Sequence, residues 1–376
     1  MSEGGGGELT LDQLEDDPHP VLARLREQEP VAWVPALDGW LVTRRDLALA
    51  AMRSPDLFTV DDPRFSTGRV VGPSMLSLEG TEHDAHREPF ARRFRLREVH
   101  QRFAGMVAGE TDRLIDAFDT AGRADLSRSL AAPLAAATVT HALDLAGVGV
   151  EQVLRWYGAI VHATTELARG AEAVTPEARA AVAELSDAVQ AGASDVATLL
   201  FGGIETTEGM IANALVHLLT HPEQLEQIRQ DPTKTANAVE ESLRLEPAAA
   251  TIDRYATRDT EFGGAHIAEG DLVTISIAAA NRDPATFPNP DAYDIARANA
   301  KQHLAFAQGP HVCIGMHLAR LEAHTALNRL LERLPEDLRL DPAQPIPTPR
   351  GLVFRKPSAV HTVWTPPPPA RERMRA

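Results

Sequence analysis

Hydrophobic residues recur every three or four positions along most of the chain, which is the spacing of one face of an amphipathic helix. The longest such stretch runs from residue 194 to 220. A last strong helix is predicted to begin near Cys313, with Met316, Ala319 and Leu327 on one face. The other predicted helices are a short one that ends by Pro30, those at 83–95, 98–120, 127–146, 149–168, 176–191 and 235–245, and one that Pro222 opens.

Two regions carry a strand pattern instead. Residues 33–42 alternate between apolar and polar positions like a hairpin, with Asp38-Gly39 as its turn. Residues 252–275 have the pattern of short strands, with turns at Gly263-Gly264 and Glu269-Gly270. The fold class predicted from these patterns is mainly α with a small β component.

The remaining segments set the expected domain limits. Residues 54–80 lack periodicity and are predicted to form a long loop, a feature that is usually functional in a compact domain. No internal break suggests a second unit, so residues 9–365 are expected to form a single domain. The termini, 1–8 and 366–376, are rich in glycine or proline and charge and are predicted to be disordered.

Composition excludes several classes of protein. The chain has 376 residues, of which 44% are hydrophobic and 24% charged, so it can bury a large core. Its net charge of −16 argues against nucleic acid as a partner. No apolar run is long enough to span a membrane, and the N-terminus lacks the features of a signal peptide. A single cysteine excludes a disulfide scaffold and favours a reducing, cytoplasmic location.

That cysteine lies in the most informative segment, Phe306-Ala-Gln-Gly309-Pro-His311-Val-Cys313-Ile-Gly315. A thiolate that binds iron needs a dry pocket and stabilisation by backbone N–H groups or by the N-terminus of a helix. The flanking glycines allow the backbone to approach the sulfur and a flat cofactor closely, and Phe306 would shield the sulfur from water. A small buried apolar residue and a catalytic nucleophile are the alternatives for Cys313, and its neighbours favour the metal ligand.

The match continues past the loop in Met316-His-Leu318-Ala319-Arg320-Leu-Glu322. Together these residues resemble the haem-thiolate monooxygenases, the cytochrome P-450 superfamily, and in particular its soluble bacterial members. The resemblance covers residues from about 10 to 365. It implies a triangular helical prism with haem b held between the long central helix and the cysteine-loop helix, and with Cys313 as the iron ligand. It also implies O₂ activation with electrons from NAD(P)H through a separate reductase, and oxidation of a small organic molecule in bacterial secondary metabolism.

Glu241-Ser-Leu-Arg244 places an acid and a base on one helical face. Such pairs usually lie on a solvated surface, but this one matches the family's Glu-x-x-Arg pair, which has a structural role. The family's third partner is commonly an arginine at the position that Ala292 occupies here. Arg297 or a histidine could take its place, or the pair could stand alone.

The pair Gly202-Gly203 interrupts the long predicted helix and is followed by Glu205 and Thr206. Two glycines inside a helix are unfavourable by about 1 kcal/mol each, so a groove beside a flat cofactor would explain them. The resemblance implies that Gly203 contacts haem and that Thr206 and Glu205 are catalytic, with Glu205 as the proton relay. The alternative is a glycine packing notch followed by a solvated Glu-Thr pair.

Haem carries two carboxylates, which need charged donors when they are buried. The resemblance assigns His83 and Arg87 to one side of haem and Arg254 and His311 to the other. With Phe306, Gly309, Cys313 and Gly315, these residues complete the predicted cofactor site. A metal site built from His83 and His86 is the rival hypothesis, and it lacks a third ligand nearby.

Arg92, Arg93, Arg95, Arg97 and Arg102 form a local basic cluster in an acidic chain. A solvated face is one interpretation. The other is a docking surface, near the proximal face of haem, for an acidic ferredoxin or flavodoxin-type electron donor.

The substrate site is predicted only in outline. The resemblance points to small and aliphatic residues, which predict a roomy apolar cavity: Leu199, Ala250, Thr251, Ile252, Leu352 and Val353. The chain between about 147 and 194 is short for the family, so we expect abbreviated lid helices and a more open distal side. Such a side would admit a large or carrier-tethered substrate. A peroxide-driven or oxidative-coupling relative and a non-catalytic haem sensor are the alternative functions, and retention of Glu205-Thr206 counts against both.

Overall fold

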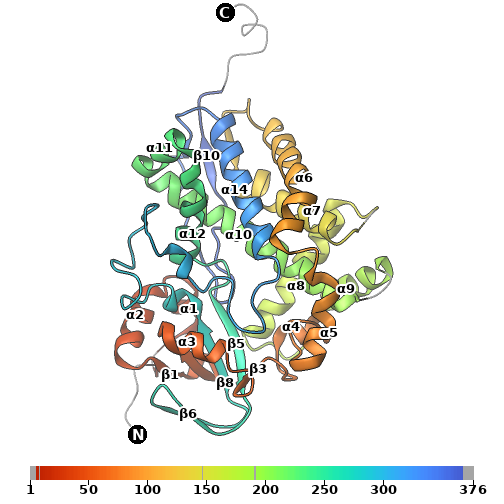
Figure 1. The fold of residues 1–376 in the computed structure, drawn as a ribbon, viewed down its shortest axis with the longest axis vertical. Helices are drawn as coiled ribbons and strands as arrows, with labels where there is room; N and C mark the ends of the chain where they lie inside the picture. Colours follow the sequence, from red (N-terminus) through yellow and green to blue (C-terminus); the bar gives the residue numbers. More distant parts are fainter. Residues whose placement is uncertain (1–5, 8, 146, 190–191, 367–376) are drawn as a thin grey trace, which may run out of the picture.

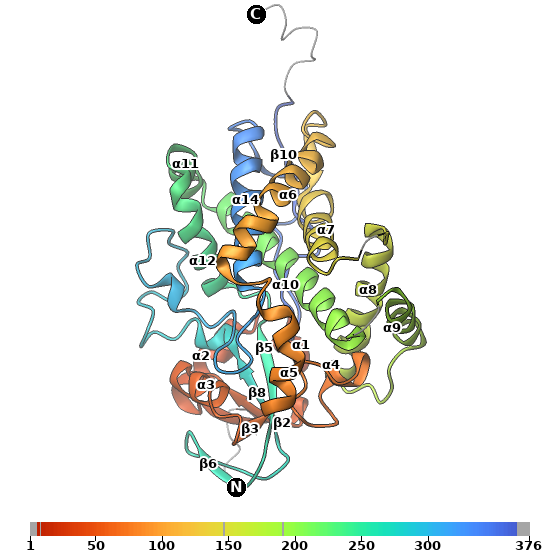
Figure 2. The ribbon, with the colours of Figure 1, turned by 45° about the vertical axis from the view of Figure 1, so that its right-hand side comes forward.

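The structure is a computed structural model that describes residues 6–7, 9–145, 147–189 and 192–366. Helices fill most of the molecule, and a small sheet region with the N-terminal segment forms one end (Figures 1 and 2). The mainly helical fold class with a small β component is therefore confirmed. Of the termini that were predicted to be disordered, residues 1–5, 8 and 367–376 lie outside the described part of the chain.

The bounds of the α-helices are α1 Leu11–Glu15, α2 His19–Gln28, α3 Arg45–Met52, α4 Ser66–Val71, α5 Gly80–Ala91, α6 Leu96–Asp116, α7 Ala132–Ala142, α8 Val150–Ala168, α9 Pro176–Ala188, α10 Ala193–Thr220, α11 Pro222–Gln230, α12 Thr235–Leu245, α13 Ile277–Ala280 and α14 Met316–Arg333. Every helix predicted from the sequence is present, whereas α1, α3, α4 and α13 occur where no helix was predicted. Short turns of other helix types are η1 Pro35–Leu37, η2 Ser127–Ala131, η3 Pro232–Lys234 and η4 Ala300–Gln302.

The strands form three small sheets. Their bounds are β1 Val31–Val34, β2 Gly39–Val42, β3 Phe58–Thr59, β4 Arg123–Asp125, β5 Thr251–Ala256, β6 Thr260–Phe262, β7 Ala265–Ile267, β8 Leu272–Ser276, β9 Arg339–Leu340 and β10 His361–Val363. The largest sheet has the strand order β1-β2-β8-β5-β3, and β5 pairs with β8 in antiparallel register. The other two sheets are β4-β10-β9 and the hairpin β6-β7.

Helix α10 runs through the middle of the molecule (Figure 2). Most of its side chains are buried, and it packs against α7, α12 and α14. The interruption predicted at Gly202-Gly203 does not occur, because α10 continues as an α-helix across both glycines. Packing on several sides compensates for the low helix propensity of glycine there.

Three other local predictions were only partly right. The loop predicted over 54–80 contains β3 and α4, which are too short to show a period. The hairpin β1-β2 is present, but η1 joins its strands, and only Asp38 at its end is left-handed, with φ of 49°. The helix predicted over 127–146 begins with the π-helical turn η2 and ends at Ala142.

Candidate functional site

A cavity with a volume of about 300 Å³ lies between α10 and the loop that precedes α14. Gly202, Gly203 and Thr206 of α10 line it. Cys313 and Arg254 line it as well. The fold thus brings the predicted cysteine and the predicted catalytic threonine to one cavity, although they are far apart in the sequence.

The cysteine loop is fixed by its backbone. The Cys313 N–H donates to the Phe306 carbonyl at 2.9 Å. Gly309 has φ of +76°, and a Cβ there would lie 2.3 Å from the Met52 carbonyl oxygen, so only glycine fits. This close contact holds the loop against the end of α3, away from the cavity. Gly309 therefore fixes the position of the loop. Gly315 lines the cavity and lies directly beside the Cys313 sulfur.

The Cys313 side chain is exposed to the cavity, three residues before α14 begins. Burial among protein atoms raises the pKa of its thiol. The backbone N–H groups of Gly315 and Met316 and the charge of Arg87 act in the opposite direction. A helix N-terminus and these donors are the surroundings that stabilise a thiolate once a metal ion binds it.

An ionic cluster supports the loop from α12 and α14. The Arg320 guanidinium lies 4.4 Å from the centre of the Phe306 ring and donates to Glu240 at 2.6 Å. His303 Nε2 lies 3.1 Å from the same carboxylate. Burial opposes ionisation of Glu240, but the bonds to His303 and Arg320 lower its pKa to about 2. The cluster thus holds the Phe306 end of the cysteine loop in place.

The predicted carboxylate-binding residues converge on one side of the cavity. Arg87 donates to the Val312 carbonyl at 2.6 Å, and the rings of His83 and His311 are 4.6 Å apart. His83 Nε2 and His311 Nδ1 are buried without a hydrogen-bond partner. Burial lowers the pKa of Arg254 to about 10, and its guanidinium donates to the carbonyl of the neighbouring Asp253. Buried polar atoms left without partners among the described residues are expected where a polar group of a ligand binds.

Glu241 and Arg244 form a fully buried pair, and the third partner is Arg297. Arg244 donates to Glu241 at 2.7 and 2.8 Å, and Arg297 donates to it at 2.9 Å. Both guanidinium groups also bond to the backbone carbonyl of Ala292. The guanidinium group that an arginine at position 292 would supply thus comes from Arg297, five residues further along the chain. Of the three options that the sequence left open, the structure selects Arg297.

The two glycines of α10 have different roles. A Cβ on Gly203 would lie 2.4 Å from the Val139 side chain, so this glycine allows α7 to pack against α10. A Cβ on Gly202 would meet no atom within 4 Å, and Gly202 lines the cavity. The sequence assigned the cofactor role to Gly203. Gly203 does line the cavity, but Gly202 is the glycine that leaves the space there open.

Thr206 also lines the cavity, and its hydroxyl donates to the Gly202 carbonyl at 2.6 Å, one turn earlier. Its oxygen keeps lone pairs that can accept a hydrogen bond from the cavity side. Thr206 is therefore placed where the sequence predicted it.

Glu205 does not line the cavity. Its side chain instead belongs to a cluster with Tyr157, Lys356 and Glu208. Its carboxylate accepts hydrogen bonds from the Tyr157 hydroxyl of α8 and from Lys356, the latter at 3.0 Å. Lys356 also pairs with Glu208 at 2.6 Å. Burial and the charges of Glu205 and Glu208 raise the pKa of Tyr157, and burial raises that of Glu208 despite Lys356. In this conformation Glu205 does not line the cavity, and its role as the proton relay stays a prediction.

A Lys356→Met variant is expected to lower the free energy of unfolding by about 2 kcal/mol. The substitution keeps the apolar stem but leaves two largely buried carboxylates without their cation. Chemical denaturation measures the change. Adding Glu208→Gln to this variant should recover about half of the loss, because a single carboxylate then remains. Strictly additive effects of the two substitutions would contradict the cluster.

The rival metal site at His83 and His86 is not formed. His83 Nδ1 lies 3.1 Å from Asp84, whereas His86 Nδ1 lies 2.7 Å from Asp195. Within the described ranges, no group of three or more His, Cys, Asp or Glu side chains is placed to hold a metal ion. Asp195 also accepts the Met75 N–H at 2.8 Å, so it ties the 54–80 segment to α10.

The basic cluster lies at the junction of α5 and α6. Arg92, Arg95, Arg97 and Arg102 are exposed, and Arg93 pairs with Asp144 at 3.2 Å. The apolar side chain of Leu96 between them is 53% exposed. An exposed apolar side chain ringed by cations is suited to an acidic protein partner.

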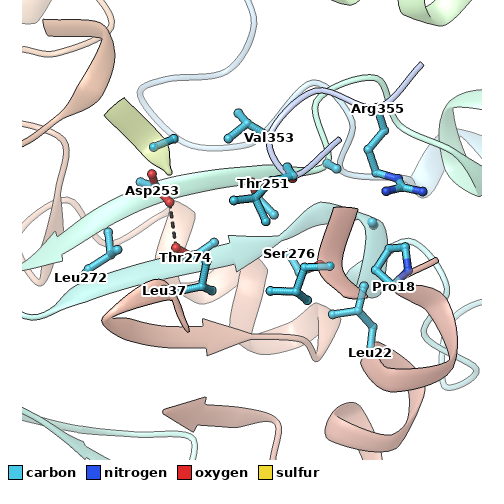
Figure 3. A pocket seen from close by; sticks show the side chains of 15 residues that line it. Pro18, Leu22, Leu37, Thr251, Asp253, Leu272, Thr274, Ser276, Val353 and Arg355 are labelled. Carbon is cyan, nitrogen blue, oxygen red and sulfur yellow. Dashed lines mark hydrogen bonds between the residues drawn. The ribbon is translucent and has the colours of Figure 1, made fainter. Parts of the chain in front are cut away.

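The predicted substrate residues divide between two cavities. Leu199, Thr251, Ile252 and Val353 line the large cavity. Ala250 and Leu352 do not. They line a smaller cavity beside it, over the β5-β8 sheet (Figure 3). Ala250 lies just before β5, so the alternation of side chains along that strand does not predict which cavity it lines.

Both lid helices are present, as α8 and α9. Helix α8 packs against α4 and α9, and Arg69 of α4 donates to the Glu172 carbonyl in the connection between the two helices. The expected abbreviation therefore does not remove either helix, and an open distal side stays a prediction.

Comparisons with known proteins agree with this geometry. A sequence profile described as Cytochrome P-450 matches residues 189–363. The chain is 35% identical over 359 residues to cytochrome P-450 monooxygenase PikC of Streptomyces venezuelae, covering 86% of this chain and 85% of that protein. The chain belongs to the cytochrome P-450 family. It is also 34% identical over 395 residues to nocardicin C N-oxygenase of Nocardia uniformis subsp. tsuyamanensis, covering 93% of this chain and 96% of the relative.

The fold of this cytochrome P-450 matches solved structures of the family. One is P-450BioI in complex with an acyl carrier protein that carries hexadec-9Z-enoic acid, with a TM-score of 0.82 and 27% identity. The match covers 93% of this chain and 98% of that one. No helix in the described part of the cytochrome has the length and apolarity needed to cross a membrane.

The family implies haem, and the cavity of this cytochrome suits that group. Cys313 would be the iron ligand. The guanidinium groups of Arg87 and Arg254 would donate to the carboxylates. The unpartnered nitrogens of His83 and His311 could donate only when the imidazoles are protonated, because the other nitrogen of each ring lies against a carboxylate. Sequence reasoning missed Glu208, Tyr157 and Lys356. The only signal for them was the rarity of lysine, which occurs at three positions.

Proposed function

We propose that this cytochrome is a haem b-dependent monooxygenase that oxidises a small organic molecule in bacterial secondary metabolism. The observation that carries the proposal is the single cavity lined by both Cys313 and Thr206. Bound haem would supply the iron chemistry that reduces O₂ and oxidises the substrate. The cytoplasm is the proposed location, and the chain over residues 9–365 is proposed to act as a single domain.

The residues of this chain have distinct proposed roles. Cys313 binds the iron, and the N–H groups of Gly315 and Met316 stabilise its negative charge. The Thr206 hydroxyl donates to the Gly202 carbonyl, so its oxygen would accept a hydrogen bond and hold a further proton at the cavity wall. Glu205 supplies that proton from the cluster with Lys356 and Tyr157, which requires its side chain to turn toward Thr206.

Electrons are proposed to come from NAD(P)H through a separate reductase and a ferredoxin or flavodoxin-type donor. The exposed arginines around Leu96 offer the docking surface. A carrier-tethered substrate is a second proposal, supported by the similarity to P-450BioI in complex with an acyl carrier protein.

A Thr206→Ala variant is expected to yield about tenfold less product per NAD(P)H consumed, because the proton on the cavity side is no longer held. A reconstituted ferredoxin system measures both quantities. Thr198→Ala is the matched control, because Thr198 has the same hydrogen bond to the carbonyl four residues earlier and also lines the cavity. Unchanged coupling in Thr206→Ala would refute the role of Thr206. Turnover with peroxide alone, at the rate of the reduced ferredoxin system, would instead indicate a peroxygenase.

A further inference from the structure

One face of the β5-β8 sheet is unexpectedly polar. Because side chains alternate along a strand, Thr251 and Asp253 of β5 share a face with Thr274 and Ser276 of β8. All four line the smaller cavity, whose volume is about 40 Å³. Apolar side chains of the N-terminal segment and of the C-terminal region line the same cavity: Leu14, Leu22, Leu37 and Leu352. Figure 3 labels Leu22 and Leu37 among them. A sheet face packed on apolar side chains is ordinarily apolar itself, so this polar row needs an explanation.

Asp253 is the charged member of that row. It pairs in register with Thr274, whose hydroxyl donates to its carboxylate at 2.8 Å (Figure 3). This is the one side-chain hydrogen bond to Asp253 within the described ranges. Burial raises the pKa of Asp253, against the effects of Thr274 and of the Arg254 charge. A carboxylate can accept about four hydrogen bonds, so most of its capacity is unused.

The basic side chains nearby are committed elsewhere. Arg254 follows Asp253 on β5, so its side chain leaves the opposite face of the sheet. Arg355 lines the smaller cavity, but its guanidinium binds Glu246 at 2.7 Å and also several backbone carbonyls. Within the described ranges, neither of these two arginines therefore pairs with the Asp253 carboxylate on the side that faces the cavity.

Asp253 also borders the large cavity. Together with Thr251 and Val353 it lines both cavities, so these three residues form their common wall. The two cavities meet at these residues, so Asp253 lies at the boundary between the smaller cavity and the one that Cys313 and Thr206 line. The smaller cavity has room for a group the size of an ammonium ion, since a water molecule needs about 10–15 Å³ of such space.

We infer that Asp253 is a substrate-recognition residue that binds a cationic, hydrogen-bond-donating nitrogen group of the substrate, while the apolar part of the substrate occupies the large cavity. This inference rests on the proposed function and adds a substrate class, organic cations with an apolar body. The hydroxyls of Thr251 and Thr274 donate to protein acceptors, and Ser276 Oγ accepts from the Ala279 N–H. The two threonine hydroxyls and the Asp253 carboxylate thus present lone pairs to the cavity, while Ser276 keeps one proton to donate, so a hydrogen-bond-donating ligand matches most of the row.

The test compares two probes, decylguanidinium and decylurea, which have the same shape and differ in charge. The guanidinium group stays protonated at neutral pH and so does not ligate iron as a free amine would. Calorimetry with the haem-loaded protein measures both dissociation constants. The wild type is expected to bind decylguanidinium at least about tenfold more tightly than decylurea. Asp253→Asn keeps the acceptor for Thr274 and is expected to remove this preference without weakening decylurea.

The matched control is Asp61→Asn, which makes the same charge change at an exposed position outside both cavities. It should retain the preference for the cation. Equal affinities of the wild type for the two probes would overturn the inference, and so would an Asp253→Asn variant that keeps the preference or loses affinity for both. The carbon monoxide spectrum of the same samples reports haem–thiolate ligation, so a failure of the proposed function is seen separately.

Discussion

A Cys313→Ser variant should lose oxygenase turnover by about 1,000-fold or more while the protein still folds. A serine hydroxyl stays protonated at this position, so the backbone donors of Gly315 and Met316 have no anion to stabilise. The side chain borders the cavity, so the exchange of sulfur for oxygen creates no clash and no buried void. Turnover in a reconstituted ferredoxin system and the carbon monoxide difference spectrum measure the result.

The accompanying spectrum should lack the red-shifted Soret band of the reduced carbon monoxide complex. The free energy of unfolding should stay within about 1 kcal/mol of the wild type, which separates loss of ligation from loss of fold. A variant with wild-type spectrum and turnover would remove the basis for assigning Cys313 as the iron ligand.

A Glu241→Gln variant is expected to have an unfolding free energy about 3–5 kcal/mol below that of the wild type. Arg244 and Arg297 both converge on this carboxylate, and all three side chains are buried. A neutral amide leaves two buried cations without their anion, and removal of one partner of a buried pair is strongly destabilising. Urea denaturation of the haem-loaded protein measures the loss.

Glu110→Gln is the matched control for that experiment. Glu110 and Arg113 form the same i, i+3 ion pair on α6, but the arginine side chain is 64% exposed. Its loss should change stability by no more than about 0.5 kcal/mol. If the two variants are equally stable, the buried network does not contribute to stability as described.

Local patterns were sufficient for the helices and for the cysteine loop. Helix α12 has the predicted bounds, because Pro247 and the apolar spacing are both local signals. The position of Thr206 at the cavity followed from the motif in the same way. The identity of the third partner did not, since only folding shows that the chain returns Arg297 to Glu241 and leaves Ala292 to contribute a carbonyl.

Side-chain direction was the main quantity that the sequence could not supply. Glu205 and Thr206 are adjacent on a helix, so their side chains point about 100° apart. Thr206 therefore lines the cavity, whereas Glu205 faces Lys356. The polar row around Asp253 depends on the register of β5 against β8, which arises from pairing across about 20 residues.

The Tyr157 hydroxyl has a mechanical consequence. It belongs to α8, yet it bonds to the carboxylate next to Thr206 on α10. Any outward movement of α8 that admits a molecule must break this hydrogen bond. Glu205 then loses Tyr157, one of its two hydrogen-bond donors, and keeps Lys356. Uptake of the substrate and readiness of the acid to turn inward are therefore joined in one movement.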